Sequence, residues 1–303
     1  MEGRSSRHKG QVEAVSDSLH IVSVVRDFEM YDRLVRNNPN NAGAEFLPFD
    51  NNAENKTIPV RYNSFLNSYD YSKEAWFVFC HEDFQFLEPL SGKLPTLDKG
   101  VIYGVFGAKL RVPGVGLQID SNKDGSDMSF RGSPVSKPTA VDTIDCACLI
   151  VHSSLVAKYS LRFDENLTYD LYTEDFGIAA QERYGIATKV LPIRSHHYSY
   201  GNIQQRFHDQ LGYLNDKYAD ASRVYVTTTA FAIGKAVALP RVNAILDTKD
   251  PKKRIPFRWL FYKKVSHKGK LVIRVLGIPV WGKIRYSMSE WHQILPQRKP
   301  FVL

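Results

Sequence analysis

The sequence predicts an α/β fold in which a mostly parallel sheet is flanked by helices. Short apolar runs alternate with helical patterns near the N-terminus, and the order strand, helix, strand, helix, strand is that of a nucleotide-binding half-sheet. Apolar residues make up 43% of the 303 residues, which is enough for a full core. The length suits one large domain with an appendage, or two small domains.

The elements of this half-sheet follow one another closely. The first strand is predicted at 19–25 and a helix at 30–37, followed by a second strand at 45–49 and a helix at 59–68. The third strand, at 76–80, reads Trp-Phe-Val-Phe-Cys. A short run rich in aromatic and β-branched residues favours a buried strand over a helix.

Later elements are marked by their boundaries. Thr173 is a suitable N-cap for a helix that Gly185 ends, and the Ala- and Val-rich stretch 224–246 is predicted to be a helix that packs the C-terminal region onto the domain. No Gly-x-Gly-x-x-Gly follows the first strand and no P-loop motif is present. Dinucleotide-binding and P-loop classes are therefore disfavoured.

Cysteine content and terminal composition indicate the compartment. Three cysteines without a Cys-x-x-Cys pair argue against a disulfide framework and a cysteine-based zinc site. Residues 1–10 are polar and basic with no apolar stretch behind them, so no secretory signal is expected. No apolar run approaches the ~20 residues that span a bilayer. We expect a cytoplasmic protein, soluble or peripheral on the inner membrane face.

Positive charge is concentrated at the C-terminus. Residues 250–303 hold thirteen basic and two acidic side chains, a net charge of +11, which leaves −3 for residues 1–249. Basic residues interleaved with aromatic ones suit an anionic membrane surface. Nucleic acid could use the same residues, but no nucleic-acid-binding signature accompanies them, and we expect none to bind. A solvated tail is the third alternative.

Three polar clusters follow apolar runs. His81 and Asp83 come directly after the third strand and point to one side, with Glu82 opposite, although a charged strand end explains the same pattern. Glu174 and Asp175 stand in the first turn of a helix, where the macrodipole alone favours acids. His196 and His197 follow 190–193 and suit either a metal site or an exposed loop.

Taken in order, these motifs resemble the family 2 glycosyltransferases with a GT-A fold, particularly a bacterial branch that makes surface polysaccharides such as lipopolysaccharide and capsule. The resemblance runs from about residue 19 to about 199. The matching residues are Asp50, Arg61 and Asn63, His81-Glu82-Asp83 in place of the usual Asp-x-Asp, Asp145 before an apolar strand, the Phe163-Asp164-Glu165 turn, Glu174-Asp175, and His197 or His196, with the register favouring His197.

The resemblance assigns a role to each motif. Asp50, Arg61, Asn63, His81 and Glu82 are expected to bind the nucleotide sugar, and the remaining residues to serve the metal, the acceptor and catalysis. Asp83 and His197 are expected to bind Mn²⁺ or Mg²⁺, and Asp145 to lie on the acceptor side. Glu174 and Asp175 are expected to be catalytic, with Asp175 as the general base.

The resemblance also implies the reaction and the organisation of the chain. It implies an inverting sugar transfer to a glycan or polyprenyl-linked acceptor, within a GT-A domain at 19–223 that lies between a tail at 1–18 and a basic region at 224–303. A catalytically inactive GT-A domain that binds glycan or nucleotide as an assembly module is the alternative, because His81 replaces the first aspartate.

Overall fold

The computed structural model describes residues 17–234, except for Arg111, Asn202, Ala230 and the side chain of Pro113, together with the backbone of three short strands further on. Those strands are β16 (Phe261–Val265), β17 (Leu271–Val275) and β18 (Ile278–Val280), which pair antiparallel. The predicted tail before residue 17 and the charged side chains of 250–303 lie outside the described residues.

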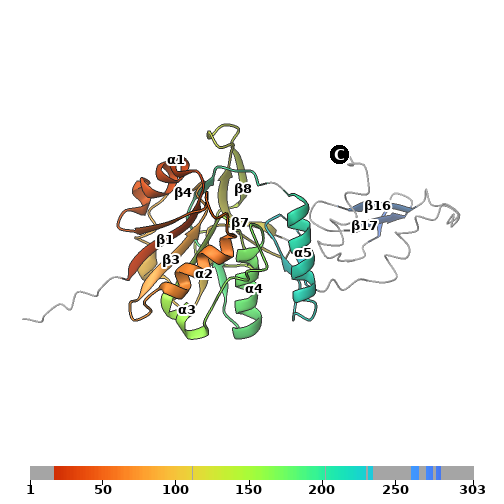
Figure 1. The fold of residues 1–303 in the computed structure, drawn as a ribbon. Helices are drawn as coiled ribbons and strands as arrows, with labels where there is room; N and C mark the ends of the chain where they lie inside the picture. Colours follow the sequence, from red (N-terminus) through yellow and green to blue (C-terminus); the bar gives the residue numbers. More distant parts are fainter. Residues whose placement is uncertain are drawn as a thin grey trace, which may run out of the picture.

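A seven-stranded mixed sheet forms the centre of the described fold (Figure 1). Its strands, in spatial order, are β2 (Glu45–Asp50), β1 (Ser18–Val25), β3 (Ala75–Cys80), β11 (Cys148–His152), β5 (Ile102–Gly104), β12 (Thr188–Val190) and β9 (Thr139–Ala140). The pairings β2–β1, β1–β3 and β5–β12 are parallel, and the others are antiparallel. The predicted α/β class and the parallel half-sheet are confirmed.

A second sheet crosses the carboxyl side of β3 and brings distant segments together. Its order is β10 (Thr143–Ile144), β6 (Gly107–Lys109), β7 (Val112–Asp120), β13 (Ser195–His197) and β4 (Phe84–Phe86), with β8 (Ser129–Ser133) also paired to β7. Because only three residues separate β3 from β4, β13 is placed beside the turn that carries His81 and Asp83.

Helices cover both faces of the central sheet. The longer ones are α2 (Ile58–Ser68), α3 (Ser153–Tyr159), α4 (Tyr172–Tyr184) and α5 (Gln205–Lys217), and the short ones are α1 (Phe28–Tyr31), a π-helix (Asp32–Arg36) and 3₁₀ turns at Pro39–Asn41 and Leu94–Thr96. Among the described residues, no helix has the length and apolar character that crossing a bilayer requires.

The fully buried β3 separates two hydrophobic cores. Its side chains alternate, so that Phe77 and Phe79 pack with apolar residues of α2, α3, α4 and α5, while Trp76 and Val78 pack with α1 and the π-helix. An apolar run without polar interruption is what a strand buried on both faces requires. The sequence prediction of a buried strand at 76–80 is confirmed.

Two predicted boundaries differ in the structure. Leu171, at φ 61°, is the N-cap of α4, whereas Thr173 lies inside the helix and donates its hydroxyl proton to the Ile144 carbonyl. Gly185, at φ 68°, ends α4 as predicted. The described part of 224–246 holds two short strands, β14 (Tyr225–Val226) and β15 (Ala232–Ile233), so a helix over that part is wrong. An apolar stretch that crosses one end of the core can pair its backbone as a hairpin.

Candidate active site

Three side chains from separate motifs meet beyond the carboxyl end of β3. His81 and Asp83 follow this strand, and antiparallel pairing of β13 with β4 places His197 opposite Phe84. His197 Nε2 lies 3.3 Å and His81 Nδ1 lies 3.8 Å from Asp83 Oδ1. Ligand atoms of all three residues lie within 4.8 Å of one another. We call this group the His81–Asp83–His197 cluster.

His197, and not its neighbour His196, belongs to the cluster. Successive side chains of β13 point to opposite faces. His196 therefore turns away, binds Ser121 Oγ at 2.8 Å through Nε2, and stacks on the Tyr198 ring. The Tyr198 backbone N–H, in turn, donates to the Asp83 carbonyl at 2.8 Å and fixes the turn.

Two ligand-type atoms of the cluster are buried without a hydrogen bond. Asp83 Oδ1 and His197 Nε2 have no such partner among the described residues. Burial works to lower the pKa of His197, but the Asp83 carboxylate outweighs it and raises that pKa to about 9. Burial works in the opposite direction on Asp83, and the His197 ring lowers its pKa well below the ordinary value. The two groups therefore face one another as a charged pair, and a metal ion that binds His197 Nε2 must displace the proton of that ring.

A tyrosine fixes the tautomer of His81. The Tyr172 hydroxyl donates its single proton to the Cys146 carbonyl at 2.9 Å, so it must accept the Nε2–H of His81 at 2.8 Å. Burial lowers the pKa of His81, which favours the neutral ring. The Nδ1 lone pair consequently faces Asp83, the arrangement that a histidine ligand to a metal requires.

Glu82 binds the backbone of the neighbouring loop. Its Oε2 accepts the N–H groups of Arg26 at 2.5 Å and Asp27 at 2.8 Å, just after β1. Asp27 in turn accepts from the Met30 N–H and caps α1. The predicted direct contact of Glu82 with a nucleotide sugar does not fit this geometry, because the carboxylate is committed to shaping the loop after β1.

The charge of Asp145 acts on His81 and His197 of the cluster, and Glu174 lies beside Asp145. Asp145 Oδ2 accepts the Thr228 hydroxyl at 2.5 Å, and Oδ1 accepts the Ala147 N–H at 3.1 Å. Glu174 is 3% exposed, and its Oε2 lies 3.1 Å from the Cys146 sulfur, which donates to it. Burial, and then the charge of Asp145, raise the pKa of Glu174 to about 8. Such a carboxyl group can exchange a proton near neutral pH.

Asp175 has a different environment from its neighbour. Its Oδ1 accepts Lys217 Nζ and the Tyr218 hydroxyl, both at 2.7 Å, and the residue is 2% exposed. Lys217 also binds Asp164 Oδ2 at 2.5 Å. The role of general base that the sequence predicts for Asp175 does not fit this arrangement, because its carboxylate docks α5 onto α4.

The residues predicted to bind the nucleotide divide into two groups. Asp50 is exposed at the end of β2, where Arg61 Nη2 donates to its carbonyl at 3.0 Å. Asn63 is 4% exposed, and its amide bonds both backbone groups of Phe163 and the Glu165 carboxylate. Asp50 and Arg61 therefore lie at the sheet edge that carries the cluster, whereas the predicted nucleotide contact of Asn63 does not fit its structural role.

Two residues at the site were not predicted. Tyr172 lies within a stretch that the motif analysis covered, but only the fold shows that it contacts His81. Thr228 reaches Asp145 from the turn between β14 and β15. No spacing or motif links Thr228 to the other site residues, so nothing in the sequence could have identified it.

Comparisons with known proteins add limited information. No family model matches the sequence, and no curated protein matches it. Many solved structures are partly similar, and three of them have 12% or 13% identity. GalNAc-T7 with UDP, GalNAc and Mn²⁺ has 12% identity and a TM-score of 0.38, over 59% of this chain and 43% of that one. Residues 1–349 of TarS from S. aureus have 12% identity and a TM-score of 0.39, over 68% and 66%.

The third similar structure is A197 from STIV, with 13% identity and a TM-score of 0.34, over 72% of this chain and 93% of that one. The match thus spans less than half of the GalNAc-T7 chain and about two thirds of the TarS chain. Likeness at this level carries no conclusion about activity.

Proposed function

We propose that this protein is a metal-assisted glycosyltransferase with a GT-A fold, which transfers a sugar from a nucleotide-diphosphate sugar to a glycan or lipid-linked glycan acceptor. One observation carries the proposal. Side chains that the sequence predicts from separate motifs converge beyond the carboxyl edge of β3, where open α/β sheets bind their ligands, and their ligand-type atoms lie within 4.8 Å of one another.

A divalent cation fits the His81–Asp83–His197 cluster. Asp83 Oδ1 and His197 Nε2 are the buried atoms without a hydrogen bond, and the Tyr172 hydroxyl leaves the Nδ1 lone pair of His81 free. Two imidazoles and one carboxylate favour Mn²⁺ over Mg²⁺, because Mg²⁺ prefers oxygen ligands. When bound, the ion supplies positive charge that stabilises a departing diphosphate.

Glu174 is the better candidate for the general base. Burial raises the pKa of both carboxyl groups. The pKa of Glu174, about 8, matches proton transfer near neutral pH, and its partners Cys146 and Thr173 are neutral, whereas Asp175 is paired with the Lys217 ammonium. In the proposed step, a Glu174 oxygen removes the proton of the acceptor hydroxyl as that hydroxyl oxygen attacks the anomeric carbon. The sugar–phosphate bond breaks on the opposite face, so the anomeric configuration inverts.

We propose that the nucleotide part of the donor binds over the carboxyl ends of the strands next to β3. Parallel pairing puts the carboxyl ends of β2, β1 and β3 at one edge, and Asp50 is exposed there. Arg61 stabilises the loop after β2 by donating hydrogen bonds to the Asp50 carbonyl and to Asn51 Oδ1. We propose that Asp50 contacts the base or ribose and that Arg61 maintains the loop that receives it.

The alternative is a GT-A domain that binds nucleotide or glycan without turnover. Two observations favour it, namely the histidine in place of the first aspartate and the burial of Asp175 in an ion pair. The two candidate functions predict different fates for bound nucleotide sugar. An enzyme releases nucleoside diphosphate when Mn²⁺ is present, whereas a binding module does not.

A two-stage experiment tests the proposal. Thermal-shift screening of the full chain against nucleoside diphosphates and nucleotide sugars, with and without Mn²⁺, identifies the donor. Diphosphate release is then measured for Glu174→Gln and Asp175→Asn, and binding for Asp83→Asn. We expect Glu174→Gln to bind the donor normally with turnover reduced about 10²-fold or more, and Asp83→Asn to lose the Mn²⁺-dependent shift.

Three outcomes would contradict parts of this assignment. Donor binding without turnover in the unmodified protein, even with added glycan acceptors, would favour the binding module. If Asp175→Asn abolishes turnover and Glu174→Gln does not, the general base is Asp175. A Mn²⁺-dependent shift that survives Asp83→Asn and His197→Gln would place the metal elsewhere.

A further inference from the structure

Cys146 connects two parts of the candidate active site. Its side chain is partly exposed, and its thiol donates to Glu174 Oε2 at 3.1 Å. Its backbone carbonyl accepts the Tyr172 hydroxyl at 2.9 Å, and that hydroxyl accepts the Nε2–H of His81 at 2.8 Å. One residue therefore contacts both the proposed general base and the tyrosine that orients a proposed metal ligand.

The two carboxyl oxygens of Glu174 have different surroundings. Oε2 lies 3.1 Å from the Cys146 sulfur and 3.1 Å from Thr173 Oγ1. Thr173 has a single hydroxyl proton, for which the Ile144 carbonyl at 3.0 Å competes, whereas Glu174 is the described acceptor of the thiol proton. Oε1 accepts no hydrogen bond from another described residue. The thiol thus holds one oxygen and leaves the other available.

No described lysine, arginine or histidine pairs with the Glu174 carboxyl group, and the charge that acts on it is that of Asp145. Burial raises the pKa of the Cys146 thiol and of the Tyr172 hydroxyl well above their ordinary values, so both groups stay neutral. A carboxylate at this position therefore depends on hydrogen-bond donors for its stability, and Cys146 supplies a donor from outside α4.

We propose that Cys146 is a positioning residue for the general base, because its thiol holds Glu174 Oε2 so that Oε1 takes the proton of the acceptor hydroxyl. The role rests on the proposed function, in which Glu174 is the base. The thiol keeps its own proton throughout, and its hydrogen bond strengthens when Glu174 becomes charged. No motif links Cys146 to Glu174, since they meet only where α4 packs against the segment before β11.

Two measurements on the full chain separate this role from the proposed function. The first is a carbon-13 NMR titration of the glutamate carboxyl groups, with the Glu174 signal assigned by its loss in Glu174→Gln. The second is the pH dependence of kcat and KM for the donor identified by screening. Cys146→Ala removes the donor group and Cys146→Ser retains one. Cys148→Ala is the matched control, because Cys148 is a buried cysteine whose thiol does not bond to Glu174.

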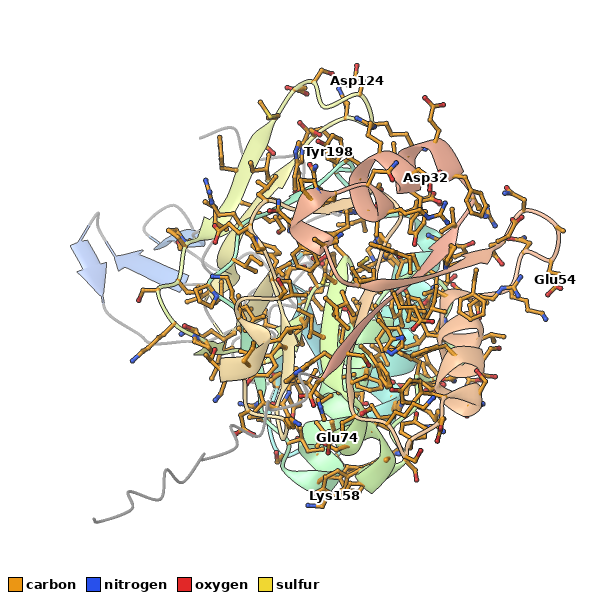
Figure 2. All side chains as sticks on the ribbon, turned by 90° about the vertical axis from the view of Figure 1, so that its left-hand side faces the viewer. Asp32, Glu54, Glu74, Asp124, Lys158 and Tyr198 are labelled. Atoms are coloured by element: carbon orange, nitrogen blue, oxygen red, sulfur yellow. The ribbon has the colours of Figure 1, made fainter. Side chains whose placement is uncertain are left out.

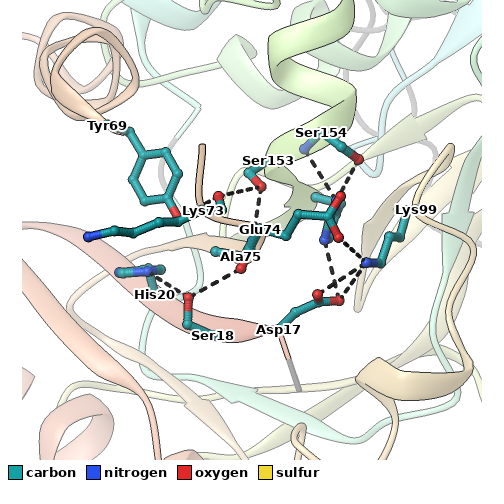
Figure 3. Close-up of polar contacts among 11 residues, drawn as sticks. Asp17, Ser18, His20, Tyr69, Lys73, Glu74, Ala75, Lys99, Ser153 and Ser154 are labelled. Atoms are coloured by element: carbon teal, nitrogen blue, oxygen red, sulfur yellow. Dashed lines mark hydrogen bonds and ion pairs between the residues drawn. The ribbon is translucent and has the colours of Figure 1, made fainter. Parts of the chain in front are cut away.

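Glu74 is the internal reference for the NMR titration. It lies near the end of the molecule opposite Tyr198, which adjoins the candidate active site (Figure 2). There its Oε2 binds Lys99 Nζ at 2.6 Å, and Asp17 Oδ2 binds the same ammonium at 3.0 Å (Figure 3). A group so far from Cys146 should give the same signal in the unmodified protein and in every variant.

We expect Cys146→Ala to raise the midpoint of the Glu174 titration, and that of the pH profile of kcat/KM, by about half a pH unit or more, because the carboxylate loses a donor. Its kcat at high pH should fall about tenfold through misplacement of the base, with KM for the donor unchanged. Cys146→Ser should recover most of both effects, and Cys148→Ala should show neither.

Two results would overturn the role of Cys146. One is a Glu174 midpoint that Cys146→Ala leaves unchanged, and the other is a shift that Cys148→Ala reproduces in full. Failure of the proposed function gives a different result, namely an unmodified protein that shows no turnover with any donor. The NMR titration does not depend on turnover, so it still measures the bond between Cys146 and Glu174 in that case.

Discussion

His81 stands where the resemblance places an aspartate, and we propose that it serves the same chemistry. The expected aspartate at this position would offer an oxygen, whereas His81 offers a nitrogen whose availability depends on the tautomer. Tyr172 decides the tautomer, because its only proton is given to the Cys146 carbonyl and its oxygen must accept from His81 Nε2. The residue that makes the substitution workable therefore lies on another element, α4.

Tyr172→Phe tests this dependence. Without the hydroxyl, His81 loses the acceptor that keeps its proton on Nε2, and we expect Mn²⁺ affinity to fall by about tenfold. Calorimetric titration with MnCl₂ measures it. Tyr62→Phe is the control, because Tyr62 is equally buried and its hydroxyl donates to the Cys80 carbonyl without touching His81. Equal losses in both variants would show a general effect of packing.

Glu174 links catalysis to pH. As a base it must be deprotonated, so turnover in the unmodified protein should rise with pH and level off above about 8, its pKa in the fold. The pH profile of kcat/KM for the donor identified by screening measures this. A profile that is flat between pH 6.5 and 9 would speak against the assignment.

The same pKa makes Glu174 a source of instability at neutral pH. The folded carboxyl holds its proton up to about pH 8, but the unfolded one loses it near 4.5. The free energy of unfolding therefore falls as pH rises through this window, by at most ~1.4 kcal/mol per pH unit. We expect Glu174→Gln to reduce the loss of Tm between pH 5 and pH 8. An unchanged pH dependence would contradict the raised pKa.

At the scale of elements, α4 and α5 are joined through one lysine. Lys217 reaches from α5 to Asp175 of α4 and to Asp164 of the preceding turn, and Tyr213 and Tyr218 bind the same two acids. Burial works to lower the pKa of Lys217, but the two carboxylates outweigh it and raise the pKa. The acids of two predicted motifs, Asp164 and Asp175, thus share a structural partner.

Lys217→Met should be strongly destabilising. It leaves the Asp175 carboxylate buried without its ion-pair partner, which costs about 3–5 kcal/mol of unfolding free energy. Urea denaturation at pH 7.5 measures this. Lys158→Met is the matched control on the surface of α3, where a change within about 0.5 kcal/mol is expected. A small effect of Lys217→Met would show that α5 is held by its apolar face alone.

At the scale of the whole molecule, the candidate site and the excess positive charge lie in different parts of the chain. The candidate site is assembled entirely from residues 17–234, while the excess positive charge belongs to residues 250–303. This division supports the proposal that the C-terminal residues hold the protein at an anionic membrane, where a polyprenyl-linked acceptor resides.

Sedimentation with liposomes tests the anchoring. The full chain should sediment with vesicles that contain anionic lipid, and less so at high salt, because screening weakens the attraction. A protein ending at Lys249 should stay in solution under the same conditions, with neutral vesicles as the control. Sedimentation of the shortened protein to the same extent would refute the anchoring role.

Local patterns in the sequence were sufficient for the fold class, for strands β1, β2 and β3, and for helices α2 and α4. Strand 76–80 could be predicted because a strand buried on both faces must be apolar throughout, and the end of α4 because Gly185 adopts a positive φ cheaply. His81, Asp83 and His197 were singled out by their places after apolar runs and by the order of the motifs, and the structure brings them together; their role as site residues stays a prediction.

Only the tertiary structure decided what each polar residue does. Glu174 and Asp175 are neighbours in sequence, and their chemistry diverges because one is buried beside Asp145 and Cys146 while the other meets a lysine from α5. Asn63 and Glu82 became structural because their hydrogen bonds go to loops far away in the chain. The sequence alone determined which groups are present and on which elements, since those follow from local pattern. Their roles required the fold, because pKa and bonding partners depend on contacts between distant segments.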